Sequence, residues 1–359
     1  MRAEPPEIVM VEKQQVLEAL GRVQDPDLRR DLVTLGMVED LEVEAGRVGF
    51  TLVLTTAACP LKDQIEGDCR AAVQAVPGVR EIAIRTTSRM RKSAAPGAER
   101  KEIPGVSHVI AVGSGKGGVG KSTVAANLAV ALAAAGAKVG LLDADIYGPN
   151  LPRMLGAHKQ LSQRDGKIVP LHAWGLEFVS MGLLVSQGEA VVWRGPMLHG
   201  AIKTFLHDVD WGELDYLVVD LPPGTGDVQL SLVQQTHVAG AVIVTTPSTV
   251  AIEDAVKGVS MFEKLQVPLL GVIENMSFFV CPSCGAQHDI FDTGTAESRF
   301  LAMGLPFLGA IPIDPGVRVG GDNGRPVVLA DPERESARAL RRIAGELARR
   351  VSIQTLGTR

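Results

Sequence analysis

Residues 112–123 read VGSGKGGVGKST, and residues 115–122 of this stretch fit the pattern G-x-x-x-x-G-K-[ST]. A short apolar run, residues 108–112, precedes the pattern and an Ala-rich helical run follows it. This is the strand-to-helix position that a phosphate-binding loop (P-loop) requires, where backbone N–H groups and a helix start attract a polyphosphate. The sequence therefore predicts a nucleotide site on Gly115, Lys116, Gly117, Gly118, Val119, Gly120, Lys121, Ser122 and Thr123.

Three side chains of this loop have predicted roles or stand out. Lys121 is placed to bridge the β- and γ-phosphates, and the Ser122 hydroxyl is placed to hold Mg²⁺. Lys116 is a second lysine, directly after the first glycine, and it has no role in the ordinary loop. The extra lysine is the feature that narrows the choice among P-loop protein families.

With both lysines, the run KGGVGKST resembles the deviant Walker A ATPases, a group that includes MinD, ParA, the nitrogenase iron protein and the Mrp/ApbC iron-sulfur carriers. In that group the extra lysine reaches the nucleotide of the partner subunit, as an arginine finger does in trans. The resemblance therefore implies a homodimeric ATPase in which Lys116 acts beside the catalytic Lys121.

Composition limits the class of protein. At 359 residues the chain is long enough for two domains, and 46% hydrophobic and 21% charged residues are typical of a globular α/β protein. The net charge of -5 argues against nucleic-acid binding through the overall field. No apolar run approaches the roughly 20 residues of a membrane span, and no leader-like segment follows Met1, so we expect a cytoplasmic protein with no membrane partner.

The first 87 residues predict a small α+β domain. Helical spacing over 12–23 and 61–75 alternates with strand patterns over 37–44, 47–54 and 79–85, in the order α-β-β-α-β. Residues 88–104 carry five basic side chains and two prolines and predict a flexible linker. Residues 105–359 then form the predicted P-loop ATPase domain, an α/β doubly wound, mostly parallel sheet.

Two cysteines lie in the small domain. Its pattern DPD at 25–27, LVTLGMV at 32–38 and TTAACP at 55–60 resembles the metal-sulfur cluster assembly domain that precedes some Mrp-type ATPases, and the characteristic cysteine of that domain maps to Cys59. Cys59 is either a ligand or exchange thiol for iron-sulfur chemistry or a small buried hydrophobe. Cys69 lies within a predicted helix, and we expect it to pack in the core.

Acidic residues end two strands of the predicted ATPase domain. Residues 138–142 lead into Asp143 and Asp145, and residues 216–220 end in Asp220 before LPPGTGD. Carboxylates at the C-terminal ends of parallel strands, beside a phosphate loop, handle Mg²⁺ and the attacking water. The resemblance implies that Asp145 orients this water, that Asp143 holds Mg²⁺ through water, and that Asp220 holds the Mg²⁺ shell opposite Ser122.

A further strand pattern over 269–274 leads into Asn275. The resemblance to the deviant Walker A ATPases implies that the amide at this position forms hydrogen bonds with the edge of adenine. The guanine signature N-K-x-D is absent from the sequence, which favours ATP over GTP.

Residues 278–288 read FFVCPSCGAQH and place Cys281 and Cys284 in a C-x-x-C turn. Converging sulfurs are suited to zinc or an iron-sulfur cluster, but such sites need about four ligands. A two-fold dimer would supply four thiolates, and the resemblance to Mrp/ApbC carriers implies a bridging 4Fe-4S cluster. A zinc knuckle with His288 as a third ligand and a redox disulfide remain as alternatives.

The C-terminal run 332–351 is amphipathic and rich in arginine; it covers the sheet or, as in MinD, lies on a membrane. The resemblance spans about 12–90 and 105–350 and implies an ATP-hydrolysing carrier that passes a labile cluster to apo iron-sulfur proteins and works with cluster assembly proteins. The alternative function is a MinD/ParA-like positioning ATPase acting on membrane or DNA.

Overall fold

The computed structural model describes residues 11–90, 102–183, 195–291 and 295–357. The chain divides into two compact units, residues 1–91 with 352–359 and residues 92–351. Most of the predicted linker, 88–104, falls on 91–101, which lie outside the described residues. Within the described ranges, none of the helices combines the length and apolar character needed to cross a bilayer.

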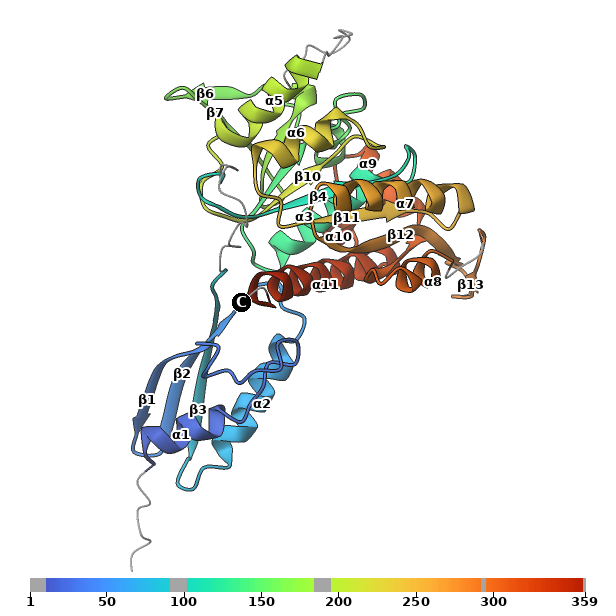
Figure 1. The fold of residues 1–359 in the computed structure, drawn as a ribbon. Coiled ribbons are helices and arrows are strands. Elements are labelled where there is room, and N and C mark those ends of the chain that lie inside the picture. Colours follow the sequence, from blue (N-terminus) through green and yellow to red (C-terminus); the bar gives the residue numbers. More distant parts are fainter. Residues whose placement is uncertain (1–10, 91–101, 184–194, 292–294, 358–359) are drawn as a thin grey trace, which may run out of the picture. The chain divides into compact units, whose positions relative to one another are not determined.

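The smaller unit has the predicted α-β-β-α-β order. Its elements are α1 (Lys13–Leu20), β1 (Val38–Glu44), β2 (Arg47–Leu54), α2 (Lys62–Gln74) and β3 (Glu81–Ser88). β1 pairs antiparallel with β2, and β2 pairs parallel with β3. Both helices cover one face of this sheet (Figure 1), where apolar side chains such as Leu20, Phe50 and Ile65 form the core. Cys69 is fully buried in that core, which confirms its predicted packing role.

The larger unit alternates strands and helices. Its first half contains β4 (Val106–Gly113), α3 (Lys121–Ala134), β5 (Val139–Asp143), α4 (Leu151–Leu155), β6 (Ser162–Arg164), β7 (Lys167–Val169), β8 (Leu171–Ala173), β9 (Leu176–Ser180), a 3-10 turn (Met181–Leu183) and α5 (Gly195–His207). Its second half contains β10 (Leu214–Asp220), α6 (Asp227–Gln235), β11 (Gly240–Thr245), α7 (Thr249–Lys264), β12 (Leu269–Val280), β13 (Gln287–His288), α8 (Thr295–Ala302), β14 (Phe307–Ile313), α9 (Pro315–Asp322), α10 (Val327–Ala330) and α11 (Glu335–Gly357).

The sheet of the larger unit has the order β13-β12-β11-β4-β10-β5-β9-β8, and β14 also pairs with β12. Its strands pair in parallel except for β8 and β13. β4, which leads into the P-loop, lies between β10 and β11, so loops from both neighbours reach the same edge. This arrangement confirms the predicted doubly wound, mostly parallel P-loop fold.

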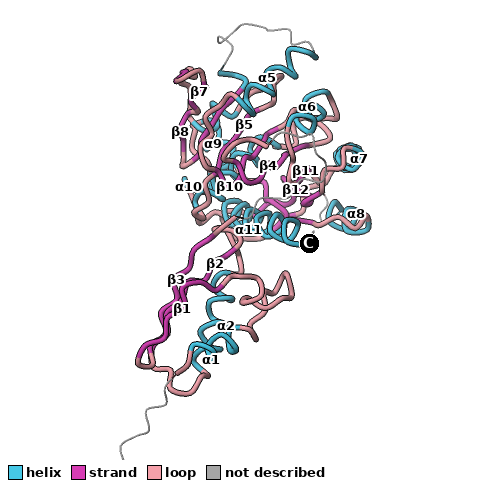
Figure 2. Tube along the Cα trace, turned by 60° about the vertical axis from the view of Figure 1, so that its left-hand side comes forward, coloured by secondary structure: helices cyan, strands magenta, loops and turns pink. Residues whose placement is uncertain are grey.

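Helices cover both faces of this sheet. Figure 2 shows α7 and α8 on one side of the strands and α9 and α10 on the other. Apolar side chains of α5, α6, α7 and α8 share one hydrophobic cluster with the strands. The apolar stripe of α11 is buried, and Ile343 packs so closely on β14 that a Cβ on Gly309 would lie 2.9 Å from it. The covering-helix interpretation of residues 332–351 is therefore the one the structure supports.

Several short strands escaped the sequence analysis. β6, β7 and β8 have three residues each, and the β6 residues are all exposed, so no period-2 apolar pattern marks them. β9 and β14 are apolar runs that are as short as many loop segments. β9 matters for function because it ends at Ser180, beside the predicted acids.

Candidate functional site

The P-loop joins β4 to α3. It requires glycine where the backbone has a positive φ and where a neighbouring backbone leaves no space for a Cβ atom. Gly118 and Gly120 have φ of 83° and 81°, a region that L side chains rarely adopt. A Cβ on Gly115 would lie 2.1 Å from the carbonyl carbon of Asp254 in α7, so only glycine fits there. Gly120 is the N-cap of α3, and no side chain in the described residues caps this helix start. Its N–H groups are therefore available to phosphate oxygens.

Lys121 is buried at the first position of α3 and faces the strand-end acids. Its Nζ lies 2.7 Å from Asp220 Oδ1, 3.5 Å from Asp145 Oδ2 and 3.2 Å from Ser122 Oγ. The ammonium group thus forms ion pairs with two carboxylates. Phosphates in this loop would compete for the same ammonium group.

Lys116, the extra lysine, is half-buried in the loop and lines the same cavity as Lys121. Its backbone oxygen accepts a hydrogen bond from the Ser114 hydroxyl at 2.9 Å. In the described part of the chain its side chain takes part in no ion pair. This side chain can therefore reorient without breaking an ion pair of the described residues.

Asp143 and Asp220 lie opposite each other at the ends of β5 and β10. Both carboxylates are fully buried. Burial, followed by the Asp220 charge, raises the pKa of Asp143 well above its ordinary value, and the Ser180 hydroxyl donates to Asp143 Oδ2 at 2.8 Å. Burial also raises the pKa of Asp220, and the neighbouring Lys121 opposes this rise. The structure thus brings all three predicted acids to the P-loop.

The residues present fit a magnesium ion. Asp220 Oδ2 is buried and has no hydrogen-bond partner within the described chain, although its other oxygen is held by Lys121. Together with the Ser122 hydroxyl it offers only oxygen ligands. Mg²⁺ takes one or two carboxylates plus phosphate oxygens and water, so Ser122 and Asp220 are the side chains that would hold it.

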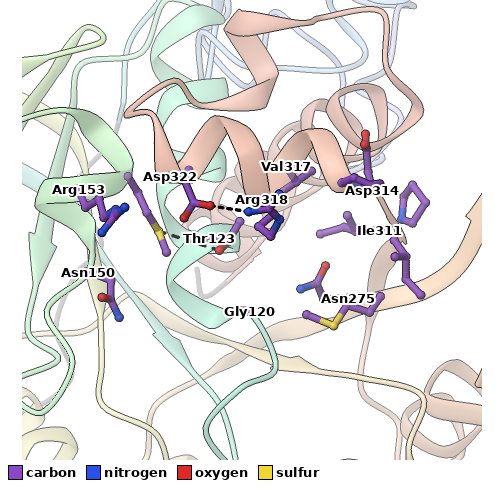
Figure 3. Close-up of a pocket in the computed structure, with 16 residues that line it drawn as sticks. Gly120, Thr123, Asn150, Arg153, Asn275, Ile311, Asp314, Val317, Arg318 and Asp322 are labelled. Atoms are coloured by element: carbon purple, nitrogen blue, oxygen red, sulfur yellow. Dashed lines mark hydrogen bonds and ion pairs between the residues drawn. The ribbon is translucent and has the colours of Figure 1, made fainter.

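Two cavities meet at the P-loop. One, of about 380 Å³, is lined by the loop itself and by Asp145, Tyr147 and Pro223. The other, of about 700 Å³, is largely apolar (Figure 3), and an ion pair of 2.7 Å between Arg318 and Asp322 borders it. Four residues line both cavities: Gly120, Thr123, Asn150 and Met154. The pair has the form of a phosphate compartment, which Lys116, Lys121 and Asp145 line, joined to a larger compartment for a base and sugar.

Asn275 lies where the apolar cavity meets the loop. Its Nδ2 donates a hydrogen bond of 2.9 Å to the Val119 backbone oxygen, and a Cβ on Gly120 would lie 2.3 Å from the same nitrogen. Because the amide nitrogen is held by the loop, the Oδ1 atom is left for a donor in the cavity that Asn275 lines (Figure 3).

The Cys281–Cys284 turn lies at the tip of a hairpin formed by β12 and β13. Backbone hydrogen bonds close it, from Cys281 N to Ala286 O at 2.9 Å and from Gly285 N to Cys281 O at 2.8 Å. Cys281 is half-buried and Cys284 exposed. Across residues 11–90, 102–183, 195–291 and 295–357, no three His, Cys, Asp or Glu side chains cluster as ligands of one metal ion. A single chain therefore offers two thiols here, and the zinc alternative with His288 gains no support.

Cys59, in the smaller unit, is half-buried against the core of that unit. Burial raises the pKa of its thiol, and the Asp25 and Asp27 carboxylates add to the rise. Asp25 is itself buried and ordered, since its Oδ1 accepts the backbone N–H groups of Asp27 and Leu28, both at 2.9 Å. These surroundings favour the thiol over the thiolate, so Cys59 stays a proposal as a ligand.

The four thiols should therefore differ in their rates of alkylation. The N–H groups of Ser283 and then Cys284 lower the pKa of Cys281, whereas burial raises the pKa of Cys69 to about 12. At pH 8 only about one Cys69 in 10,000 would be a thiolate, because the thiolate fraction falls tenfold per unit below the pKa. Iodoacetamide labelling of metal-free protein, read by peptide mass spectrometry, should modify Cys281 and Cys284 first, then Cys59, and Cys69 only after unfolding. Equal labelling of Cys69 and Cys281 would contradict this order.

Several residues of the site are not marked by a sequence pattern. Ser180 ends the short strand β9, Asn150 is the N-cap of α4, and Met154 lies within that helix. The apolar cavity is walled by residues 311–322, IPIDPGVRVGGD, whose two prolines mark a turn at the end of β14. Those prolines are the one local sign that this segment could shape a pocket.

Comparisons with known proteins agree with this geometry. Residues 105–348 match the family described as NUBPL iron-transfer P-loop NTPase, and residues 13–84 match the iron-sulfur cluster assembly protein family. An iron-sulfur cluster carrier protein of Deinococcus radiodurans is 53% identical over 343 residues, which are 95% of this chain and 96% of that protein.

Two solved structures are similar to the larger unit. A nucleotide-binding protein of Archaeoglobus fulgidus in complex with ADP aligns with a TM-score of 0.56 and 38% identity, over 66% of this chain and 92% of that one. The MinD protein of Pyrococcus horikoshii with Mg-ADP aligns with a TM-score of 0.51 and 27% identity, over 66% and 94% of the two chains. Given a family match across more than half of its length and a relative identical at 53% of aligned positions, the chain belongs to the iron-transfer P-loop NTPases of the iron-sulfur cluster carrier group.

Proposed function

We propose that the protein is a cytoplasmic, homodimeric ATPase that binds a labile iron-sulfur cluster and passes it to apo iron-sulfur proteins. One observation carries the proposal: β12 contains Asn275, which contacts the P-loop, and Cys281 directly follows the last residue of this strand. One continuous strand thus connects the nucleotide compartment to the cysteine turn.

ATP is the nucleotide that fits the two cavities. Its phosphates would lie on the P-loop N–H groups and Lys121, and its base in the apolar compartment. The Asn275 oxygen would accept from the adenine amino group, which guanine lacks at that position. ADP in the Archaeoglobus fulgidus relative supports an adenine nucleotide in this chain.

Hydrolysis requires a water in line with the bond between the γ-phosphorus and the β,γ-bridging oxygen. Asp145 borders the phosphate cavity and would orient that water, whose oxygen bonds to the γ-phosphorus as ADP leaves. Mg²⁺, held by Ser122 and Asp220, with Asp143 acting through water, would neutralise charge that develops on the phosphates. Lys116 of each protomer would reach the nucleotide of the other.

The cluster is the cargo, and we assign its binding to Cys281 and Cys284 of both protomers. Two thiols per chain are half of the usual four, so a two-fold dimer completes the set. Four thiolates suit either a 2Fe-2S or a 4Fe-4S cluster, and the resemblance to Mrp/ApbC carriers favours 4Fe-4S. Residues 1–87 would take part in iron-sulfur cluster assembly. Residues 88–104 would link this domain to residues 105–359, which would bind ATP and contain the cysteine pair. Cluster assembly proteins would be the donors.

The alternative function is a MinD/ParA-like positioning ATPase. The similarity to MinD lies in the fold of the nucleotide-binding unit. That function has no use for a C-x-x-C turn. The buried stripe of α11 also removes the segment that would have served as a membrane helix.

The test is anaerobic purification of the full chain, followed by measurement of iron, acid-labile sulfide and molar mass, with and without ATP. We expect about four iron and four sulfide atoms per dimer, the stoichiometry of one bridging cluster. A metal-free monomer in both conditions, after reconstitution with iron and sulfide, would contradict the proposal. A cluster on the monomer would contradict only the bridging arrangement.

A further inference from the structure

Residues 221–226, LPPGTG, form the loop between β10 and α6 that borders the phosphate cavity through Pro223. The loop is tied to the P-loop by a backbone hydrogen bond of 2.8 Å from Gly224 N to Ser114 O. It directly follows Asp220. A residue that sets the position of this loop would therefore affect the part of the phosphate cavity where we expect the γ-phosphate.

Gln229, in the first turn of α6, holds the loop from the other side. Its Nε2 donates to two loop carbonyls, Pro222 O at 2.8 Å and Gly224 O at 2.9 Å. The side chain is only 2% exposed. Two carbonyl acceptors fix which end of the amide is nitrogen, because an oxygen placed there would face two other oxygens.

The other end of this amide is unsatisfied. Gln229 Oε1 is buried and accepts no hydrogen bond from the residues that the structure describes. Most buried polar atoms in proteins are paired, so an exception at a functional loop calls for a physical reason. A second arrangement of the loop, in which this oxygen gains a donor, would supply one.

The start of α6 contains that donor. Gly226 is the N-cap of the helix and Gln229 is its N3 residue, the two positions of a capping box. In a capping box the N3 side chain accepts the N-cap N–H, but here α6 has no side-chain cap. A Cβ built on Gly226 would lie 3.7 Å from Gln229 Oε1, so the two groups are already neighbours.

We propose that Gln229 is a positioning residue for the γ-phosphate loop, and that its amide closes the capping box with Gly226 N–H when ATP, but not ADP, is bound. The inference rests on the proposed ATPase function. Nε2 keeps its hydrogen bonds to the loop carbonyls in the ADP-bound and the ATP-bound protein. Oε1 gains a donor only when the loop closes over the γ-phosphate. α6 thereby registers which nucleotide is present.

Hydrogen exchange of the wild-type protein tests this without any substitution. Backbone amides of residues 224–227 are compared in ADP and in a non-hydrolysable ATP analogue, both with Mg²⁺. We expect exchange to slow by about tenfold or more with the analogue relative to ADP, because a new hydrogen bond protects the N-cap amide. Equal exchange in the two nucleotides would overturn the proposal.

Two substitutions separate positioning from simple packing. Gln229→Glu keeps the shape but places an oxygen against the loop carbonyls, and Gln229→Met keeps the volume without hydrogen bonds. Both should keep ADP affinity within about threefold and lose about tenfold or more in kcat, because the loop acts at the γ-phosphate. Gln234→Glu, at an exposed glutamine of the same helix, is the matched control and should behave as wild type.

Two outcomes would overturn the role of Gln229: wild-type kcat in the Gln229→Glu protein, or equal losses of ADP and ATP affinity in both variants. Absence of turnover in the wild-type protein would instead refute the proposed function. If the variants do not fold, the wild-type exchange experiment decides alone.

Discussion

Replacing Lys121 by alanine is expected to reduce ATP turnover by about a thousandfold and to lower the melting temperature of the nucleotide-free protein by about 10 °C. The first effect follows from the loss of the cation that bridges the phosphates. The second follows from the structure, in which the same ammonium group lies 2.7 Å from the fully buried Asp220. Breaking a buried ion pair on one side costs about 3–5 kcal/mol, since the remaining charge stays buried.

The destabilisation should depend on pH with a defined sign. Burial already raises the pKa of Asp220, and removal of Lys121 takes away the group that opposes the rise. A carboxyl whose folded-state pKa lies above its unfolded value stabilises the fold at low pH and loses this contribution as pH rises through the folded value. The Lys121→Ala protein should therefore lose more stability, relative to wild type, at pH 8 than at pH 5.5, as measured by thermal unfolding.

A second substitution distinguishes the two effects. The Lys121→Ala, Asp220→Asn protein should recover much of the lost stability, because no unpaired charge remains at Asp220, and should recover no turnover. Lys116→Ala is the matched control for stability, since Lys116 is half-exposed and makes no ion pair within the described chain. If Lys121→Ala unfolds at the wild-type temperature, the ion pair contributes nothing to stability. If it hydrolyses ATP at the wild-type rate, the nucleotide site is misassigned.

Cys281→Ala and Cys284→Ala should each reduce the iron retained after anaerobic reconstitution by about tenfold or more. In the proposed dimer each substitution removes two of four thiolates, because it occurs in both protomers. Visible charge-transfer absorbance and sulfide content measure the loss. Cys281 is half-buried and Cys284 is exposed, so both variants should unfold at the wild-type temperature.

Two other variants make this result specific. His288→Ala, in the same hairpin, should retain the cluster, whereas a zinc knuckle would lose metal with it. Cys59→Ala should retain the cluster if Cys59 is a packing residue of the smaller unit. Full clusters on both Cys281→Ala and Cys284→Ala would remove the basis of the carrier assignment to this turn.

The features predicted from the sequence agree best with the structure where neighbouring residues alone determine the conformation. The P-loop could be read from eight residues because glycines encode its backbone conformation, and both Gly118 and Gly120 adopt the positive φ that this requires. The helices and strands of the smaller unit match their patterns closely, since α1 and α2 show apolar spacing and β2 alternates. The C-x-x-C turn is also local, and its closing hydrogen bonds join residues at most five positions apart.

The sequence by itself determined the P-loop, the acids at strand ends and the cysteine turn, because each is a contiguous pattern with its own conformational preference. Only the tertiary structure decided which groups meet: Lys121 with Asp220, 99 residues away, and Asn275 with Val119, 156 residues away. Strand order β12-β11-β4-β10-β5 creates these contacts, and it differs from chain order. The buried, half-satisfied Gln229 likewise became visible only in the packed molecule, because a single glutamine has no periodicity to reveal its partners.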